Sequence, residues 1–323
     1  MENVCKEMID FLKLQNSSIT ANEVAFTFIG DNVMSCAYGL SGKSFSSGNS
    51  IMQKIRENMS MSTKIGLVAH TLGLFFPKFC HLFNISYLGK QTPPLFKDLI
   101  SMAIKTREES KIVGNDFIDY LAESRRKDDK HYMGYAMSFY LDGFETGAYT
   151  FVYVLLEVAR NPLVQEKARK EVDGVYSNHN TVYSYEAVKD MHYVESIIYE
   201  TLRKHPSIKF LNRVCTKDYI ISAPHKDNNG KQVIIKKGTH IFIPVEAIHR
   251  DEKYFPYPKE FNPSRFNQDT RKLRLKQNFL GFGDGPRVCL GQKFAVTQLK
   301  MALAAILLNF KISINNKTVF QFY

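Results

Sequence analysis

One thiol lies in a glycine-rich run of the chain, Phe282-Gly283-Asp284-Gly285-Pro286-Arg287-Val288-Cys289-Leu290-Gly291. The glycines allow backbone turns that a Cβ would hinder, and apolar residues recur at helical spacing after Gly291. Cys289 is therefore expected at the N-terminal end of a helix, where free N–H groups and the helix dipole stabilise a thiolate. Such a thiolate can bind a metal ion. The alternative is a buried structural cysteine in a turn, the commoner role of a lone cysteine.

The run resembles the haem-binding loop of the cytochrome P450 family, the haem-thiolate monooxygenases, in the pattern F-G-x-G-x-R-x-C-x-G. The resemblance implies that haem b is the cofactor and that Cys289 is the axial ligand of its iron. It also implies that Arg287 binds a haem propionate. Phe282, Gly283 and Gly291 would then belong to the cofactor-binding loop.

Two charged segments earlier in the chain resemble further motifs of the same family. Glu200 and Arg203 are spaced i,i+3 on a predicted helix, which brings both charges to one face, and Arg265 lies in the segment Phe261–Phe266. Taken alone, Glu200 and Arg203 would be a solvated surface pair. Their likeness to the family's ExxR and FxPxRF motifs implies a buried cluster of the three side chains beneath the haem. Loss of one partner from such a cluster typically costs about 3–5 kcal/mol.

A long, mostly apolar run extends from about His131 to Asn161. Its length would suit a transmembrane span, but Asp142 and Glu145 lie near its middle, where ionised carboxylates are costly in lipid. The run therefore predicts a helix buried in protein. A glycine and a threonine in its middle are expected to weaken the regular helical hydrogen bonding.

The segment Asp142-Gly143-Phe144-Glu145-Thr146 resembles the oxygen-activating stretch of the family's central helix. The resemblance implies that Thr146 donates a hydrogen bond to iron-bound oxygen and that Glu145 is the neighbouring proton relay. Asp142 departs from the family's usual small residue before Gly143, so its carboxylate is expected at the haem edge. It could form hydrogen bonds or narrow the substrate pocket there. Alternatively, it could form an ester with the haem, as a glutamate does in one branch of the family.

Arg213 follows the ExxR-like segment at the position where similar microsomal P450 enzymes place a propionate-binding arginine. The resemblance implies this role for Arg213, and the alternative is an arginine that flanks a strand. Cys215 has no motif around it and is interpreted as structural. The segments Asn212–Thr216 and Ile243–Arg250 resemble insect detoxification-type members, which implies xenobiotics or small lipophilic endogenous compounds as substrates.

The chain of 323 residues has 44% hydrophobic content, enough for a large core, and it shows no linker or repeat, so a single domain over residues 1–323 is expected. Helical patterns dominate, and short strand-like runs cluster after Arg213. This predicts a mainly α fold with small β-sheets, as in the cytochrome P450 fold. The expected helices cover Ala21–Tyr38, Ser50–Met61, Phe96–Arg126, His131–Asn161, Leu163–Tyr176, Val188–Lys204 and the segment after Cys289; the expected strands cover Asp218–Ser222, Val233–Ile235 and Thr239–Ile243, with a turn at Asp227–Gly230.

The net charge of +11 raises nucleic acid, an anionic membrane or an acidic protein as partners. No sequence motif supports nucleic acid as a partner. The resemblance implies an NADPH-dependent flavoprotein reductase, with cytochrome b5 as a second donor, and Lys272, Arg274 and Lys276 are expected near its docking face. Five scattered cysteines suit a reducing compartment and show no zinc-site spacing.

Membrane contact is expected through the aromatic and basic stretch Ile65–Leu88, although internal core is an equal alternative. By resemblance, the protein would be peripheral at the cytoplasmic face of the endoplasmic reticulum membrane. Full-length microsomal members are longer at both ends, so the chain is expected to be a fragment whose anchor is missing. Two functions are therefore open: a monooxygenase acting on O₂ and a small lipophilic substrate, and a catalytically inactive haem-binding or non-functional fragment of such an enzyme.

Overall fold

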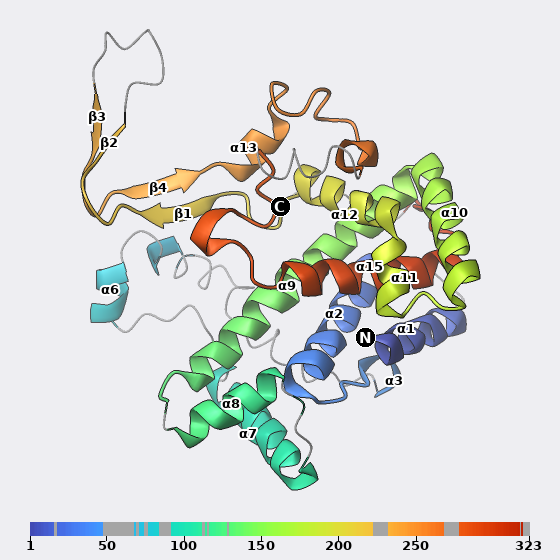
Figure 1. The fold of residues 1–323 in the computed structure, drawn as a ribbon, viewed down its shortest axis with the longest axis horizontal. Coiled ribbons are helices and arrows are strands. Elements are labelled where there is room, and N and C mark those ends of the chain that lie inside the picture. The colour runs from blue at the N-terminus through green and yellow to red at the C-terminus, as the bar shows by residue number, and fades with distance from the viewer. Residues whose placement is uncertain are drawn as a thin grey trace. The chain divides into compact units, whose positions relative to one another are not determined.

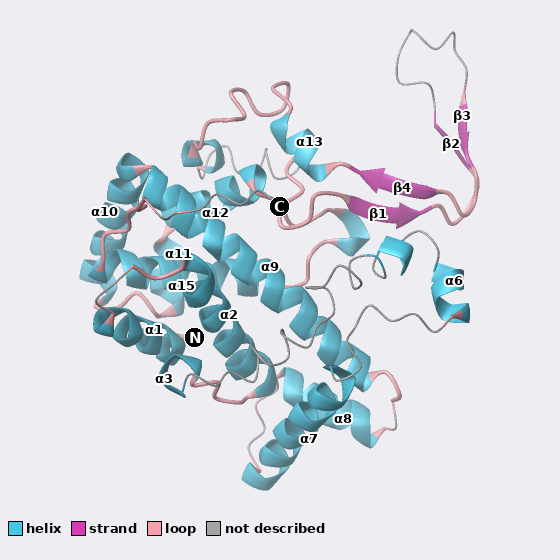
Figure 2. Cartoon of the chain, turned by 180° about the vertical axis from the view of Figure 1, so that it is seen from behind, coloured by secondary structure: helices cyan, strands magenta, loops and turns pink. Residues whose placement is uncertain are grey.

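The computed structural model describes residues 1–15, 18–47, 68, 71–73, 77–83, 92–111, 114, 116–127, 129–221, 232–267, 278–316 and 318. The chain divides into two compact units, of which the first combines Met1–Met191 with Phe294–Tyr323 and the second is His192–Lys293. Helices dominate the described residues, and the described strands all belong to the second unit (Figure 2). The predicted mainly α fold with small sheets is confirmed.

The first unit is organised around the long helix α9 (Tyr132–Arg160), against which α2 (Ala21–Tyr38) packs (Figure 1). The Thr20 hydroxyl caps the start of α2, and Gly39 ends it with φ +63°, so the predicted bounds of this helix are confirmed. The other described helices of this unit are α1 (Glu2–Leu14), α3 (Ser44–Ser47), α6 (Pro77–Leu82), α7 (Thr92–Ser110), α8 (Phe117–Arg126), α10 (Pro162–His179), α11 (Tyr185–Asp190) and, from Phe294 onward, α15 (Gln292–Asn309).

The single helix predicted over Phe96–Arg126 is wrong, because two helices occupy this range. Lys111 has φ +54° directly after α7, and the Asp116 side chain caps the start of α8 by accepting a hydrogen bond from Asp119 N. The Arg107 guanidinium pairs with both Asp116 (2.7 Å) and Asp119 (2.8 Å), which holds α7 against α8. A specific ion-pair contact therefore joins the two helices across the break.

The helix predicted over Val188–Lys204 is also divided. Helix α11 ends at Asp190, and α12 (His192–Lys204) begins after Met191, whose ψ of 76° is not helical. The buried Met191 lies at the boundary between the two units. Helix α1 was not predicted, although its apolar side chains at helical spacing, Val4, Cys5, Met8 and Ile9, are buried.

The second unit contains two small antiparallel sheets. In one, β1 (Leu211–Val214) pairs with β4 (His240–Ile243), with Arg213 opposite Ile241; in the other, β2 (Tyr219–Ile221) pairs with β3 (Val233–Ile235). The three predicted strands are thus present, and β1 was missed as an element. The unit also contains α12, α13 (Val245–Arg250) and the 3-10 helices η3 (Pro263–Phe266) and η4 (Gly285–Arg287).

Some predictions fall outside the described residues. These are the helix Ser50–Met61, the turn Asp227–Gly230, the basic residues Lys272, Arg274 and Lys276, and most of the aromatic stretch Ile65–Leu88. Among the helices that the structure describes, none is long and apolar enough to cross a membrane.

Candidate functional site

Backbone hydrogen bonds hold the loop that carries Cys289. Cys289 N donates to Phe282 O at 2.9 Å, and Gly283 N donates to Leu280 O at 2.9 Å. Gly283 and Gly285 have φ of +70° and +73°, in the left-handed region where a side chain is strained. The loop is therefore closed on itself by main-chain contacts and requires glycine at its two turning points.

The thiol of Cys289 is exposed, and its neighbours in the chain are exposed apolar side chains. Val288 is 42% and Leu290 100% exposed, while helix α15 begins shortly afterwards at Gln292. A Cβ placed on Gly291 would lie 4.0 Å from Cys289 Sγ, so this glycine borders the sulfur. Cys289 is therefore not the buried structural cysteine that was the alternative prediction.

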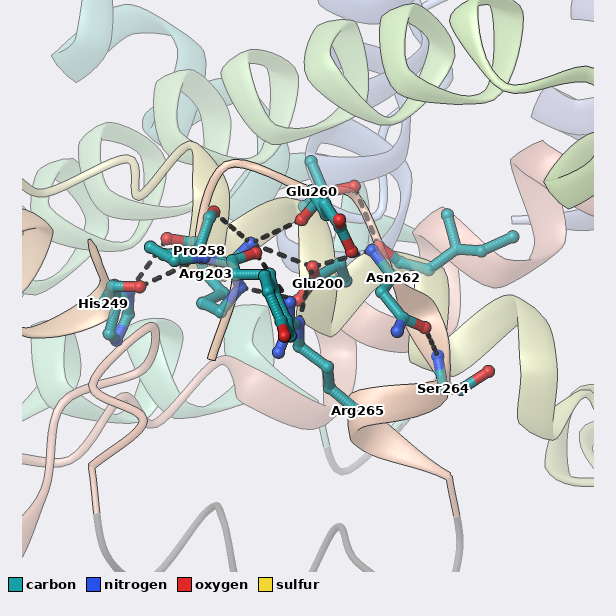
Figure 3. Close-up of polar contacts among 11 residues, drawn as sticks. Glu200, Arg203, His249, Pro258, Glu260, Asn262, Ser264 and Arg265 are labelled. Carbon is teal, nitrogen blue, oxygen red and sulfur yellow. Dashed lines mark hydrogen bonds and ion pairs between the residues drawn. The ribbon is translucent and has the colours of Figure 1, made fainter. Parts of the chain in front are cut away.

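The side chains of Glu200, Arg203 and Arg265 meet inside the second unit (Figure 3). Arg203 Nε lies 2.7 Å from Glu200 Oε2, and both side chains are fully buried. Arg265 Nε lies 3.4 Å from Glu200 Oε1. Glu200 and Arg203 are therefore not the solvated pair that their spacing alone would suggest, because helix α12 turns its charged face inward.

Main-chain groups add further hydrogen bonds to this cluster. The Arg203 guanidinium donates to the carbonyl oxygens of His249 (3.0 Å), Pro258 (3.0 Å) and Glu260 (3.1 Å). Asn262 N donates to Glu200 Oε1 at 2.9 Å. A buried ion pair is stabilising only where its remaining hydrogen-bonding groups find partners, and here the segment 257–265 supplies several of them.

His249 belongs to the same network and was missed by the sequence analysis. It is fully buried in α13, where Figure 3 shows it beside Arg203. Both ring nitrogens lie at hydrogen-bond distance from main-chain atoms: Nδ1 is 3.2 Å from Arg203 O, and Nε2 is 2.8 Å from Leu280 N. No local pattern indicates these contacts, because both partners are distant in the sequence. Burial lowers the pKa of His249 to about 4.

This pKa predicts a loss of stability in acid. The native ring stays neutral down to about pH 4, whereas an unfolded histidine binds a proton below about 6.5, so the unfolded state gains protons first as the pH falls. The His249 contribution is therefore complete above pH 6.5 and decreases towards pH 4, by on the order of 3 kcal/mol. Denaturant unfolding across this range should show a smaller pH dependence in His249→Gln. Equal slopes in both proteins would contradict the assignment.

The two arginines predicted to bind propionates both lie in the second unit. Arg213 is half-buried on β1 and donates to Asn212 O, and Arg287 is exposed in η4. Leu211 of β1 lies 4.0 Å from the position of a Cβ on Gly283, so this strand touches the Cys289 loop. Among the residues that the structure describes, neither arginine forms an ion pair with a carboxylate, which leaves both guanidinium groups available to an anion.

The residues predicted to activate oxygen lie on α9 in the first unit. The Thr146 hydroxyl donates to Asp142 O, and the Thr150 hydroxyl donates to Thr146 O at 2.7 Å. Such bonds to carbonyls one turn back loosen and bend helices. Asp142 is exposed, yet partial loss of its hydration raises the pKa of its carboxyl. Glu145 and Thr146 are half-buried.

Comparisons with known proteins identify the family of the chain. The sequence model of the family Cytochrome P450 matches residues 1–321. The chain is 32% identical to probable cytochrome P450 28a5 of Drosophila melanogaster, over 98% of this chain and 64% of that protein. It is 30% identical to cytochrome P450 6j1 of Blattella germanica, over 94% and 60%. The chain therefore belongs to the cytochrome P450 family, and it spans somewhat under two thirds of these relatives' length.

Haem is the cofactor that this family implies, and the Cys289 loop fits it. Haem supplies four ring nitrogens to its iron and requires axial ligands from the protein, so a single accessible sulfur is a suitable donor. Val288 and Leu290, the neighbours of Cys289 in the chain, are exposed and apolar, as residues that contact a porphyrin would be. The guanidinium groups of Arg213 and Arg287 have the charge and geometry to bind propionates.

Proposed function

We propose that this chain is the haem-binding part of a monooxygenase that inserts one oxygen atom from O₂ into small lipophilic substrates. The observation that carries the proposal is the Cys289 loop, in which main-chain hydrogen bonds present an exposed thiol between apolar side chains. Family membership supports the same reaction class. The cofactor in this proposal is haem b, and residues 1–323 form a single, partial P450 domain.

The roles proposed for the residues follow from their chemistry. A haem-thiolate centre supplies electron density that favours O–O cleavage. Cys289 would supply the thiolate that binds the haem iron, and Arg213 and Arg287 would hold the propionates. Glu200 with its two arginines fixes the segment 257–265 by the contacts described above.

The residues proposed for proton handling lie on α9. The Thr146 hydroxyl is assigned to hydrogen-bond donation, and the Glu145 carboxyl to proton transfer during oxygen activation. For Asp142, we propose hydrogen bonding at the substrate pocket rather than an ester with the haem. Partial loss of hydration raises the pKa of its carboxyl, so this carboxyl takes up a proton more readily than a fully hydrated aspartate. Acid extraction that released unmodified haem completely would agree with this assignment.

The electron donor proposed is an NADPH-dependent flavoprotein reductase, with cytochrome b5 as a further donor. The net charge of +11 suits an acidic partner, and binding should weaken with salt. Xenobiotics or small lipophilic endogenous compounds are the proposed substrates, as for an insect detoxification-type enzyme. Peripheral contact with the cytoplasmic face of the endoplasmic reticulum membrane completes the proposal.

The reaction is tested with isotopically labelled dioxygen. The haem-loaded chain is incubated with NADPH, a flavoprotein reductase and a panel of small lipophilic compounds, and products are identified by mass spectrometry. The proposal predicts a product with one labelled oxygen atom that requires both NADPH and reductase, and that is absent with Cys289→Ser. A chain that binds haem through sulfur but forms no such product would instead be a catalytically inactive haem-binding chain.

A further inference from the structure

The tautomer of the buried His249 follows from its two hydrogen bonds. Leu280 N is a main-chain donor, so the Nε2 atom that it contacts at 2.8 Å must accept and carries no proton. The ring proton of neutral His249 is then on Nδ1 and is donated to Arg203 O at 3.2 Å. His249 thus connects the C-terminal turn of α12 to a main-chain amide directly before the Cys289 loop.

Aromatic packing fixes the ring in this orientation. His249 stacks on Phe279 with ring centroids 5.2 Å apart and an interplanar angle of 5°, and Phe255 lies edge-on to His249 with centroids 5.7 Å apart. Phe279 is itself buried against Tyr199 of α12. A Cβ on Gly281 would collide with the Phe279 ring, so the chain passes over that ring closely. Residues 279–281 are therefore packed tightly although they form no helix or strand.

Successive hydrogen bonds lead from this residue to the thiol loop. Leu280 N is held by His249, Leu280 O accepts from Gly283 N at 2.9 Å, and Phe282 O accepts from Cys289 N at 2.9 Å. The second and third bonds share the peptide group between Phe282 and Gly283, and the first two bonds use the two peptide groups on either side of Leu280. The position of the Cys289 main chain therefore depends on where Leu280 is anchored.

We propose that His249 is a positioning residue for Cys289, and that it acts by accepting the Leu280 amide hydrogen bond while donating to Arg203 O. This inference rests on the proposed role of Cys289 as the haem ligand. Burial keeps the ring neutral near pH 7, and Arg203 is the charged group that faces it, so the acceptor on Nε2 persists. A merely space-filling ring would need neither nitrogen.

Three substitutions distinguish the hydrogen bonds of the two ring nitrogens from space filling by the ring. In His249→Gln, an amide at the end of the longer side chain can replace Nε2 as the acceptor for Leu280 N. In His249→Asn, the shorter amide can replace Nδ1 as the donor to Arg203 O, but it does not reach Leu280 N. His249→Phe keeps the aromatic ring and removes both hydrogen bonds. Space filling alone predicts that the phenylalanine variant is the best substitute.

The test combines amide hydrogen exchange with the spectrum of the reduced, carbon monoxide-bound protein. In the wild-type chain, the Leu280 amide should exchange slowly. In His249→Asn and His249→Phe, it should exchange roughly ten-fold faster or more, because its acceptor is lost. The red-shifted Soret band of thiolate-ligated haem should fall severalfold in the same two variants and be largely kept in His249→Gln.

Several results would overturn the inference. Fast exchange of Leu280 in the wild-type chain would remove its basis, and this measurement needs no variant to fold. A wild-type spectrum in His249→Asn or His249→Phe would show that the Leu280 anchor does not position the sulfur. Absence of the red-shifted band from the wild-type chain itself would instead reject the proposed function, and with it the ligand that His249 would position.

Discussion

Replacing Arg203 with alanine should lower the free energy of unfolding by about 3–5 kcal/mol. The substitution leaves the fully buried Glu200 carboxylate without the guanidinium at 2.7 Å. It also removes the donors to the carbonyl oxygens of His249, Pro258 and Glu260. The expected cost is therefore that of an uncompensated buried charge together with unsatisfied main-chain acceptors.

Denaturant unfolding followed by far-UV circular dichroism measures this effect, and the same unit offers a matched control. Arg250 pairs with Glu246 at 2.7 Å, but its side chain is 57% exposed. Arg250→Ala should therefore change stability by no more than about 0.5–1 kcal/mol. Arg203→Lys should lie between the two, since lysine keeps the charge but not the planar set of donors. Similar losses in Arg203→Ala and Arg250→Ala would show that the buried cluster is not stabilising in this way.

Replacing Cys289 with serine should abolish thiolate ligation of haem. Serine has nearly the same shape, so the loop and its main-chain hydrogen bond to Phe282 O should persist. An unperturbed hydroxyl is not ionised near neutral pH and lacks the soft sulfur donor that defines this type of centre. The red-shifted Soret band of the reduced, carbon monoxide-bound protein should therefore disappear, while the far-UV circular dichroism spectrum stays close to wild type.

Cys215→Ser is the matched control for this substitution. Cys215 is half-buried, and its thiol donates to Lys217 O at 2.9 Å, a bond that a serine hydroxyl can also form. The variant should keep the full red-shifted band. Loss of the band in Cys215→Ser, or its survival in Cys289→Ser, would show that Cys289 is not the haem ligand.

Local signals in the sequence are sufficient to predict several helices and turns. Thr20 as a capping residue and Gly39 as a left-handed terminator mark both ends of α2, and the apolar run before Pro162 predicts α9 to within one residue at each end. The turning glycines of the Cys289 loop were likewise predicted, and Gly283 and Gly285 have positive φ. These features depend on neighbours in the chain, so a pattern can predict them.

Features that depend on distant partners were not predictable in this way. The break between α7 and α8 has a local signal in the Asp116 cap, but the pairing of Arg107 with Asp116 and Asp119 across it has none. His249 lies in an ordinary apolar segment, and its partners Arg203 and Leu280 are 46 and 31 residues away. Glu200 and Arg203 have the spacing of a surface pair, and only the burial of α12 distinguishes them.

The central claim, that Cys289 presents a thiolate to haem, is tested most directly on the wild-type chain. Haem is added, the protein is reduced under carbon monoxide, and the absorption spectrum is recorded. The structure predicts a strongly red-shifted Soret band, because an exposed, main-chain-anchored sulfur is available as the axial ligand. A folded chain that takes up no haem, or that binds it without the red-shifted band, would contradict the claim.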